Sequence, residues 1–111
     1  MIPQLNPAEL AAWRSDAARP APVLVDVRSD EAFTADPRLI PGSTRRAADK
    51  VADWARALNG RSAVVTCHHG LELSQGVAAM LRHEGIAAEA LEGGAAGWAD
   101  AVVLPGVGFP D

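Results

Sequence analysis

The chain has 111 residues, which predicts one domain, residues 1–111, that is large enough to bury its own core. Hydrophobic residues make up 49% and charged residues 22%, and the formal net charge of −4 argues against a nucleic-acid or anionic-membrane surface. No apolar run approaches the roughly 18 residues of a membrane span, and we expect no signal peptide. A single cysteine allows no internal disulfide, so we expect a cytoplasmic protein.

The first predicted element is a helix that begins after Asn6. The Asn6 side chain can cap this helix, Pro7 suits the first helical position, and Glu9 would complete a capping box. The apolar face of this helix is expected to consist of Leu10, Trp13 and Ala17.

The first long strand is predicted over residues 23–27, a nearly continuous apolar run that is typical of a parallel strand covered on both faces. Ser29 can open a short helix, and prolines then interrupt a long connection that ends near residue 43. Asp49 is expected to cap a further helix. The apolar face of that helix would be Val51, Trp54, Ala55 and Leu58.

The only cysteine lies where a strand is predicted to give way to a helix. Residues 64–66 form an apolar, β-branched strand end, and Cys67 follows them directly. The next helix is expected to bury Leu73, Val77, Met80 and Leu81. Ligands bind at the carboxyl ends of parallel strands, and a helix N-terminus there favours negative charge. A thiol at this position should lose its proton readily, so we predict that Cys67 is a thiolate nucleophile.

The last part of the chain contains one more strand and one short helix. Gly85 is expected to end the preceding helix, and Ala87–Leu91 reads as the strand. A glycine-rich turn over residues 92–97 leads into the final helix, and residues 102–111 are expected to form an irregular tail. Strands that alternate with helices predict an α/β fold, a parallel sheet with helices on both faces.

Four stretches, in this order, resemble the rhodanese-like domain. They are LVDVR at 24–28, IPGS at 40–43, VVTCHHG at 64–70, and LEGG at 91–94 with GW at 97–98. The resemblance covers residues 6 to 98 and implies a rhodanese-like α/β fold with a central parallel sheet of about five strands. It also implies a sulfurtransferase, without a cofactor, whose Cys67 carries sulfane sulfur as a persulfide. By resemblance, Asp26 and Arg28 would brace the active-site loop.

The cysteine loop departs from the family pattern. Family sulfurtransferases commonly have an arginine or another polar residue five positions after the cysteine and a serine or threonine next. Here Glu72 and Leu73 stand at these positions and Ser74 follows one residue later, so we infer a loop one residue longer. Such a loop resembles the rhodanese-fold phosphatases and arsenate reductases, but these need an arginine where Leu73 stands. Leu39 also replaces the usual histidine before IPGS.

The candidate active-site loop has seven members after the cysteine. They are His68, His69, Gly70, Leu71, Glu72, Leu73 and Ser74, and the amides of residues 68–73 would surround the sulfur. The two histidines can attract an anionic donor or simply face solvent. We expect no metal site, because no second ligand cluster lies within useful spacing.

Glu72 has two alternative placements. If its carboxylate points into the site, it repels a dianionic donor such as thiosulfate and disfavours the thiolate. If it points outward, it is a solvated helix-start carboxylate that suits the helix dipole.

The leading functional hypothesis is sulfur transfer. The sulfur would come from thiosulfate or another small-molecule or protein-bound donor, and a thiol or cyanide would accept it. The alternative is a non-catalytic rhodanese-like module that binds a partner or relays sulfur within one complex. A phosphatase or arsenate reductase is the third reading, and we expect its activity to be absent.

Overall fold

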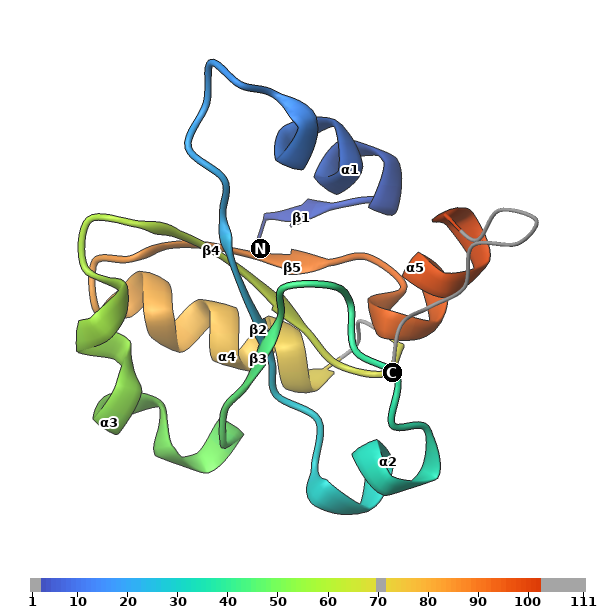
Figure 1. Cartoon of the computed structure of the whole chain (residues 1–111). Coiled ribbons are helices and arrows are strands. Elements are labelled where there is room, and N and C mark those ends of the chain that lie inside the picture. Colours follow the sequence, from blue (N-terminus) through green and yellow to red (C-terminus); the bar gives the residue numbers. More distant parts are fainter. Residues whose placement is uncertain (1–2, 70–71, 103–111) are drawn as a thin grey trace.

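A five-stranded parallel sheet organises the chain (Figure 1). The computed structural model describes residues 3–69 and 72–102. The strands are β1 (Gln4–Leu5), β2 (Val23–Asp26), β3 (Thr44–Arg45), β4 (Ser62–Thr66) and β5 (Ala87–Leu91). Their order in the sheet is β1-β5-β4-β2-β3, and every neighbouring pair is parallel. The predicted α/β fold and the strand number that the resemblance implied are confirmed.

Helices cover both faces of this sheet (Figure 1). They are α1 (Pro7–Ser15), α2 (Asp30–Ala35), α3 (Val51–Trp54), α4 (Glu72–His83) and α5 (Gly94–Val102), with the 3-10 turns η1 (Ala48–Lys50) and η2 (Ala55–Leu58) on either side of α3. Among the described residues, no helix is long and apolar enough to cross a membrane.

Alternate residues of the central strand β4 face two separate cores. Ala63 and Val65 pack in a cluster with residues of α3 and α4, whereas Val64 packs in a second cluster with residues of α1 and α5. Successive side chains of a strand point to opposite faces, so one apolar run fills both cores.

Helix α1 begins as predicted but ends early. The Asn6 side chain accepts a hydrogen bond from the Glu9 amide at 2.8 Å, and the Glu9 carboxylate accepts one from the Asn6 amide at 2.9 Å. The helix stops at Ser15, so the placement of Ala17 on its apolar face was wrong. The carboxylate of Asp16 accepts from the amide of Ala18 at 2.9 Å, and such a local bond competes with helix continuation.

The helix expected after Ser29 is present, but the next helix is broken. The Ser29 hydroxyl caps α2 by accepting a hydrogen bond from the Ala32 amide at 3.1 Å. Asp49 does not cap the following helix, because the chain already turns at Ala48 and Asp49 lies inside η1. The expected apolar side chains Val51, Ala55 and Leu58 are buried, and Trp54 is half-buried.

The buried face of α4 matches the predicted one at Val77 and Leu81 but not at the other two positions. Leu73 is 42% exposed and Met80 is 49% exposed, so both were wrongly assigned to the core. The buried residues are Ser74, Val77, Ala78 and Leu81, which recur at the helical spacing. The expected helix end is confirmed, since Gly85 has a φ of 84° and the amide of Ile86 donates to the Leu81 carbonyl at 3.0 Å. The tail was predicted over 102–111, but Val102 is the last residue of α5, and residues 103–111 lie outside the described residues.

Candidate active site

Cys67 follows the last residue of β4 at the carboxyl edge of the sheet. Thr66, the preceding residue, is in register with Asp26 of β2. The start of α5 holds the backbone on the other side, because the amide of Ala95 donates to the carbonyl of Cys67 at 2.8 Å. The amide of Ala96 similarly donates to the carbonyl of His68 at 3.0 Å. Two elements that are distant in sequence therefore fix the backbone that carries the cysteine.

The cysteine belongs to the wall of a pocket. Only 6% of Cys67 is exposed, yet it lines a hollow of about 240 Å³. The other lining residues are Arg28, Ser29, Ala32, His68, His69, Glu72 and Leu73. The thiol therefore packs within the apolar cluster of α3 and α4 and also borders this hollow, through which a small substrate would reach it.

A buried serine hydroxyl lies next to the cysteine sulfur. The Cys67 Sγ and Ser74 Oγ atoms are 3.2 Å apart, and Ser74 is fully buried on the sheet-facing side of α4. As a thiol, Cys67 donates to this oxygen. As a thiolate it would instead accept from the serine hydroxyl, and a hydrogen bond to the charged form stabilises that form.

The two loop histidines and Glu72 border the same pocket. His68 is half-buried and His69 is exposed, with ring centroids 4.2 Å apart. The Nδ1 atom of His68 is buried without a hydrogen-bond partner among the described residues. Glu72 is exposed in the first turn of α4 and also lines the pocket, so it is a solvated carboxylate beside the space for a substrate. Gly70 and Leu71 lie outside the described residues, so the expected ring of loop amides stays a prediction.

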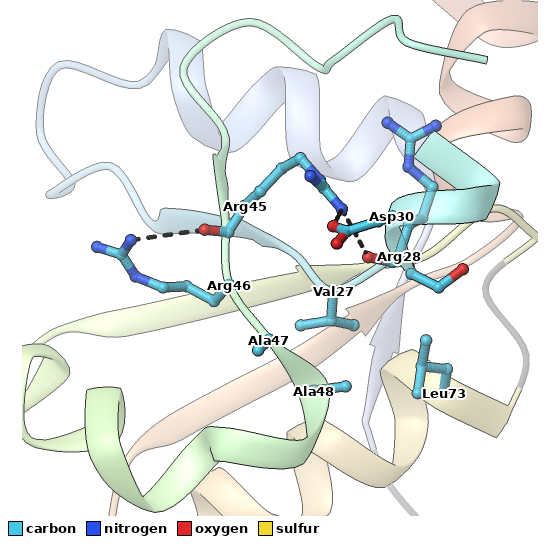
Figure 2. A pocket seen from close by; sticks show the side chains of 9 residues that line it. Val27, Arg28, Asp30, Arg45, Arg46, Ala47, Ala48 and Leu73 are labelled. Atoms are coloured by element: carbon cyan, nitrogen blue, oxygen red, sulfur yellow. Dashed lines mark hydrogen bonds and ion pairs between the residues drawn. The ribbon is translucent and has the colours of Figure 1, made fainter. Parts of the chain in front are cut away.

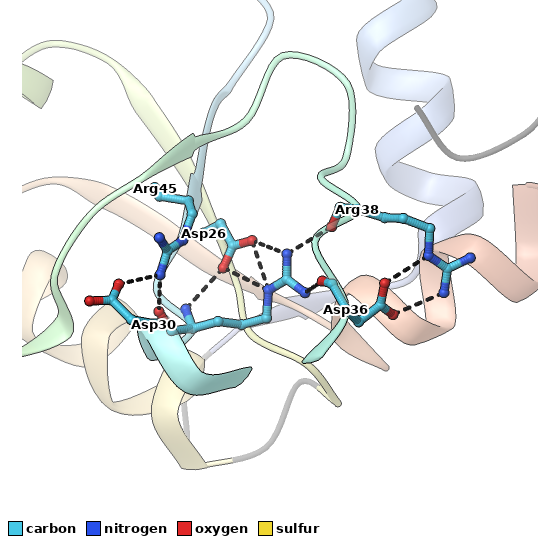
Figure 3. Close-up of polar contacts among 6 residues, drawn as sticks. Asp26, Asp30, Asp36, Arg38 and Arg45 are labelled. Carbon is cyan, nitrogen blue, oxygen red and sulfur yellow. Dashed lines mark hydrogen bonds and ion pairs between the residues drawn. The ribbon is translucent and has the colours of Figure 1, made fainter. Parts of the chain in front are cut away.

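Asp26 and Arg28 form a buried ion pair at the end of β2. Figure 3 shows the Asp26 carboxylate in this group of polar contacts. The Arg28 guanidinium lies 2.8 Å from the Asp26 carboxylate, and both side chains are at most 2% exposed. It also donates to the carbonyls of Asp36 and Arg38, both at 2.7 Å. These bonds fix the connection between α2 and β3, and Arg28 meets the cysteine loop through the pocket wall that they share.

A second pocket of about 410 Å³ adjoins the first one (Figure 2). Arg28, Ser29 and Leu73 line both pockets. The remaining walls of the second pocket are Val27, Asp30, Arg45, Arg46, Ala47 and Ala48. The sequence patterns did not predict this second pocket. The signal that could have revealed it is the pair of small residues, Ala47 and Ala48, that follows Arg46 after β3.

The described residues contain no group of three or more histidine, cysteine, aspartate or glutamate side chains that could hold a metal ion.

Comparison with known proteins identifies the family. A family model for the rhodanese-like domain matches residues 6–101. A rhodanese-like domain protein from Staphylococcus aureus is 26% identical, with a TM-score of 0.76, over 93% of this chain and 97% of its own. A Rhodopseudomonas palustris protein described as a possible tyrosine phosphatase is 25% identical, with a TM-score of 0.76, over 90% of this chain and 81% of its own.

A third solved structure shares the fold alone. It is a thiosulfate sulfurtransferase from Pseudomonas aeruginosa, 22% identical with a TM-score of 0.77, matched over 94% of this chain but only 19% of its own. No curated protein matches the sequence. The family model spans every strand from β2 to β5 and the cysteine between β4 and α4. The chain belongs to the rhodanese-like domain family.

Proposed function

We propose that this protein is a sulfurtransferase that carries sulfane sulfur on Cys67 as a persulfide. The observation that supports this best is the pairing of Cys67 Sγ with the buried Ser74 Oγ at 3.2 Å, in the wall of an open pocket. The serine hydroxyl can donate to the negative sulfur both before and after the transfer. Charge on the nucleophile would then be stabilised without a metal or a second titrating group.

The reaction has two displacement steps. The Cys67 thiolate attacks the outer sulfur of thiosulfate, the sulfur–sulfur bond of the donor breaks, and sulfite leaves with the bonding electron pair. The enzyme then holds Cys67–S–S⁻. An acceptor, cyanide or a thiolate, attacks the outer sulfur of this persulfide and restores the Cys67 thiolate. In each cycle Cys67 takes one sulfur atom from the donor and passes one sulfur atom to the acceptor, so the enzyme returns to its starting form.

The phosphatase reading lacks its essential group. A phosphate ester held at a cysteine loop needs a guanidinium that binds two of its oxygens. The side chain six positions after Cys67 is Leu73, which has no donor and is 42% exposed. Glu72 on the same pocket adds a repelling charge for a phosphate dianion.

The test is the mass of the intact protein after incubation with thiosulfate, mercaptopyruvate or a small organic persulfide. The proposal predicts a gain of one sulfur atom in the wild type and none in Cys67→Ser. If none of these donors adds sulfur, the protein is instead a non-catalytic rhodanese-like module. Turnover of a chromogenic phosphate ester or of arsenate would support the phosphatase or arsenate reductase alternative.

A further inference from the structure

The larger pocket beside the active site has an apolar floor. Figure 2 shows the side chains of Val27, Ala48 and Leu73 facing one another across it, with the Arg45–Asp30 pair at its edge. Because Ala48 ends at its β-carbon, it leaves space that a longer side chain would occupy. The pocket therefore offers about 410 Å³ to a group that is mainly hydrocarbon.

Leu73 stands between this pocket and the cysteine. Its side chain lines both hollows, and it remains 42% exposed although it is apolar. Arg28 and Ser29 also line both. Because the two hollows share these three wall residues, a molecule with its sulfur at Cys67 would have to extend past Leu73 to reach the larger pocket.

The charges around the two pockets do not favour a compact dianion at the sulfur. Asp26 neutralises Arg28 in their buried pair, and Asp30 neutralises Arg45 at 2.9 Å. Glu72 adds a carboxylate on the cysteine side, where His68 and His69 also line the pocket, while Arg46, the third arginine of the lining, is exposed on the far pocket. A donor without charge near its reactive sulfur therefore suits this arrangement better than thiosulfate does.

We propose that the sulfur donor is a small organic persulfide, R–S–SH, whose hydrocarbon R group occupies the pocket of Val27, Ala48 and Leu73. This inference rests on the proposed sulfurtransferase function and names its substrate class. The Cys67 thiolate attacks the outer sulfur and forms Cys67–S–SH. The sulfur–sulfur bond of the donor breaks, and R–S⁻ leaves with the electron pair.

Burial of the R group should make the protein prefer persulfides with longer hydrocarbon chains. Each methylene removed from water favours binding about fourfold, the equivalent of ~0.8 kcal/mol. We expect butyl persulfide to load Cys67 at least about tenfold faster than methyl persulfide at low concentration, because its longer chain reaches past Leu73.

The experiment follows Cys67 loading by intact mass in a single turnover with methyl and butyl persulfide. Ala48→Leu fills the pocket and should lower the butyl rate to the methyl rate, so that the butyl preference is lost. Ala57→Leu is the matched control, because Ala57 is exposed on η2 and lines neither pocket. Equal methyl and butyl rates in the wild type, or a butyl preference that survives Ala48→Leu, would overturn the inference.

A non-reacting probe separates this inference from the proposed function. Butyl methyl sulfide added to the wild-type protein should shift the amide NMR signals of Val27, Ala48 and Leu73. If no donor loads Cys67 although the probe shifts these signals, the sulfurtransferase function fails and the pocket stands as a hydrocarbon site. If donors load Cys67 but the probe shifts none of these signals, the pocket assignment fails alone.

Discussion

The hydroxyl oxygen of Ser74 lies 3.2 Å from the sulfur of Cys67, although seven positions separate the two residues in sequence. The strand β4 ends at Thr66, directly before the cysteine, and the buried face of α4 delivers the serine. A fully buried hydroxyl has little access to water, so its hydrogen bond to the sulfur is a fixed part of the site.

Removal of this hydroxyl should slow the chemistry of the cysteine. A hydrogen bond to a charged group contributes about 1.5–3 kcal/mol, so Ser74→Ala should lower the rate of Cys67 alkylation by iodoacetamide at neutral pH at least about tenfold. Ser74→Thr keeps the hydroxyl and should retain most of the rate. An alanine variant that alkylates as fast as the wild type would show that the serine does not stabilise the thiolate.

Neutralising Glu72 should favour anionic donors. Because Glu72 is exposed, solvent screens its repulsion, and Glu72→Gln should raise the rate of Cys67 loading by thiosulfate about threefold to tenfold. Glu72→Arg should raise it further, and added salt should reduce both gains. Glu84→Gln, directly after the opposite end of α4, is the control and should change little. If a folded Glu72→Arg protein is loaded by thiosulfate more slowly than the wild type, Glu72 does not repel the anionic donor.

The buried pair of Asp26 and Arg28 should matter mainly for folding. Arg28→Ala leaves the Asp26 carboxylate buried without its partner and should lower the free energy of unfolding by about 3–5 kcal/mol in urea denaturation. Arg38→Ala breaks the more exposed Arg38–Asp36 pair and should cost less than about 1 kcal/mol. Similar losses in the two variants would mean that Arg28 does not hold the end of β2.

The pKa of Asp36 provides a test of that exposed pair. The hydrogen bond from the Arg38 side chain lowers the pKa of this carboxyl to about 2, from an ordinary value of 3.8. The folded-state pKa lies below the unfolded value, so the pair stabilises the fold fully above about pH 4. Its contribution disappears as the pH falls towards 2. An NMR titration should place the Asp36 midpoint near 2 and, in Arg38→Ala, closer to 3.8. Identical midpoints would exclude the pair in solution.

Sequence patterns located the elements that have strong local signals. Strands β2 and β4 were found because apolar, β-branched runs must be buried, and Cys67 follows β4. The start of α1 and the end of α4 could be predicted from the sequence, because Asn6 and Gly85 have specific capping roles. The edge strands β1 and β3 contain two residues each, which is too short to show the alternation of apolar and polar residues that identifies a strand.

Other features depend on tertiary packing that the sequence does not encode locally. Ser74 and Ala78 are buried because small side chains let α4 approach the sheet, whereas the larger Leu73 and Met80 remain exposed. The acceptors of Arg28 beyond Asp26 are backbone carbonyls, which every residue has. The second pocket likewise arises where β2, the segment after β3 and the start of α4 meet.

The most direct test of the central claim is discharge of sulfur from a preloaded protein. Protein that carries one additional sulfur atom after donor treatment is freed of donor and mixed with cyanide. The account predicts that the mass returns to that of the original chain, with one thiocyanate released per Cys67. Sulfur that stays on the protein, or that loads Cys67→Ser equally well, would contradict the role of Cys67 as the sulfur carrier.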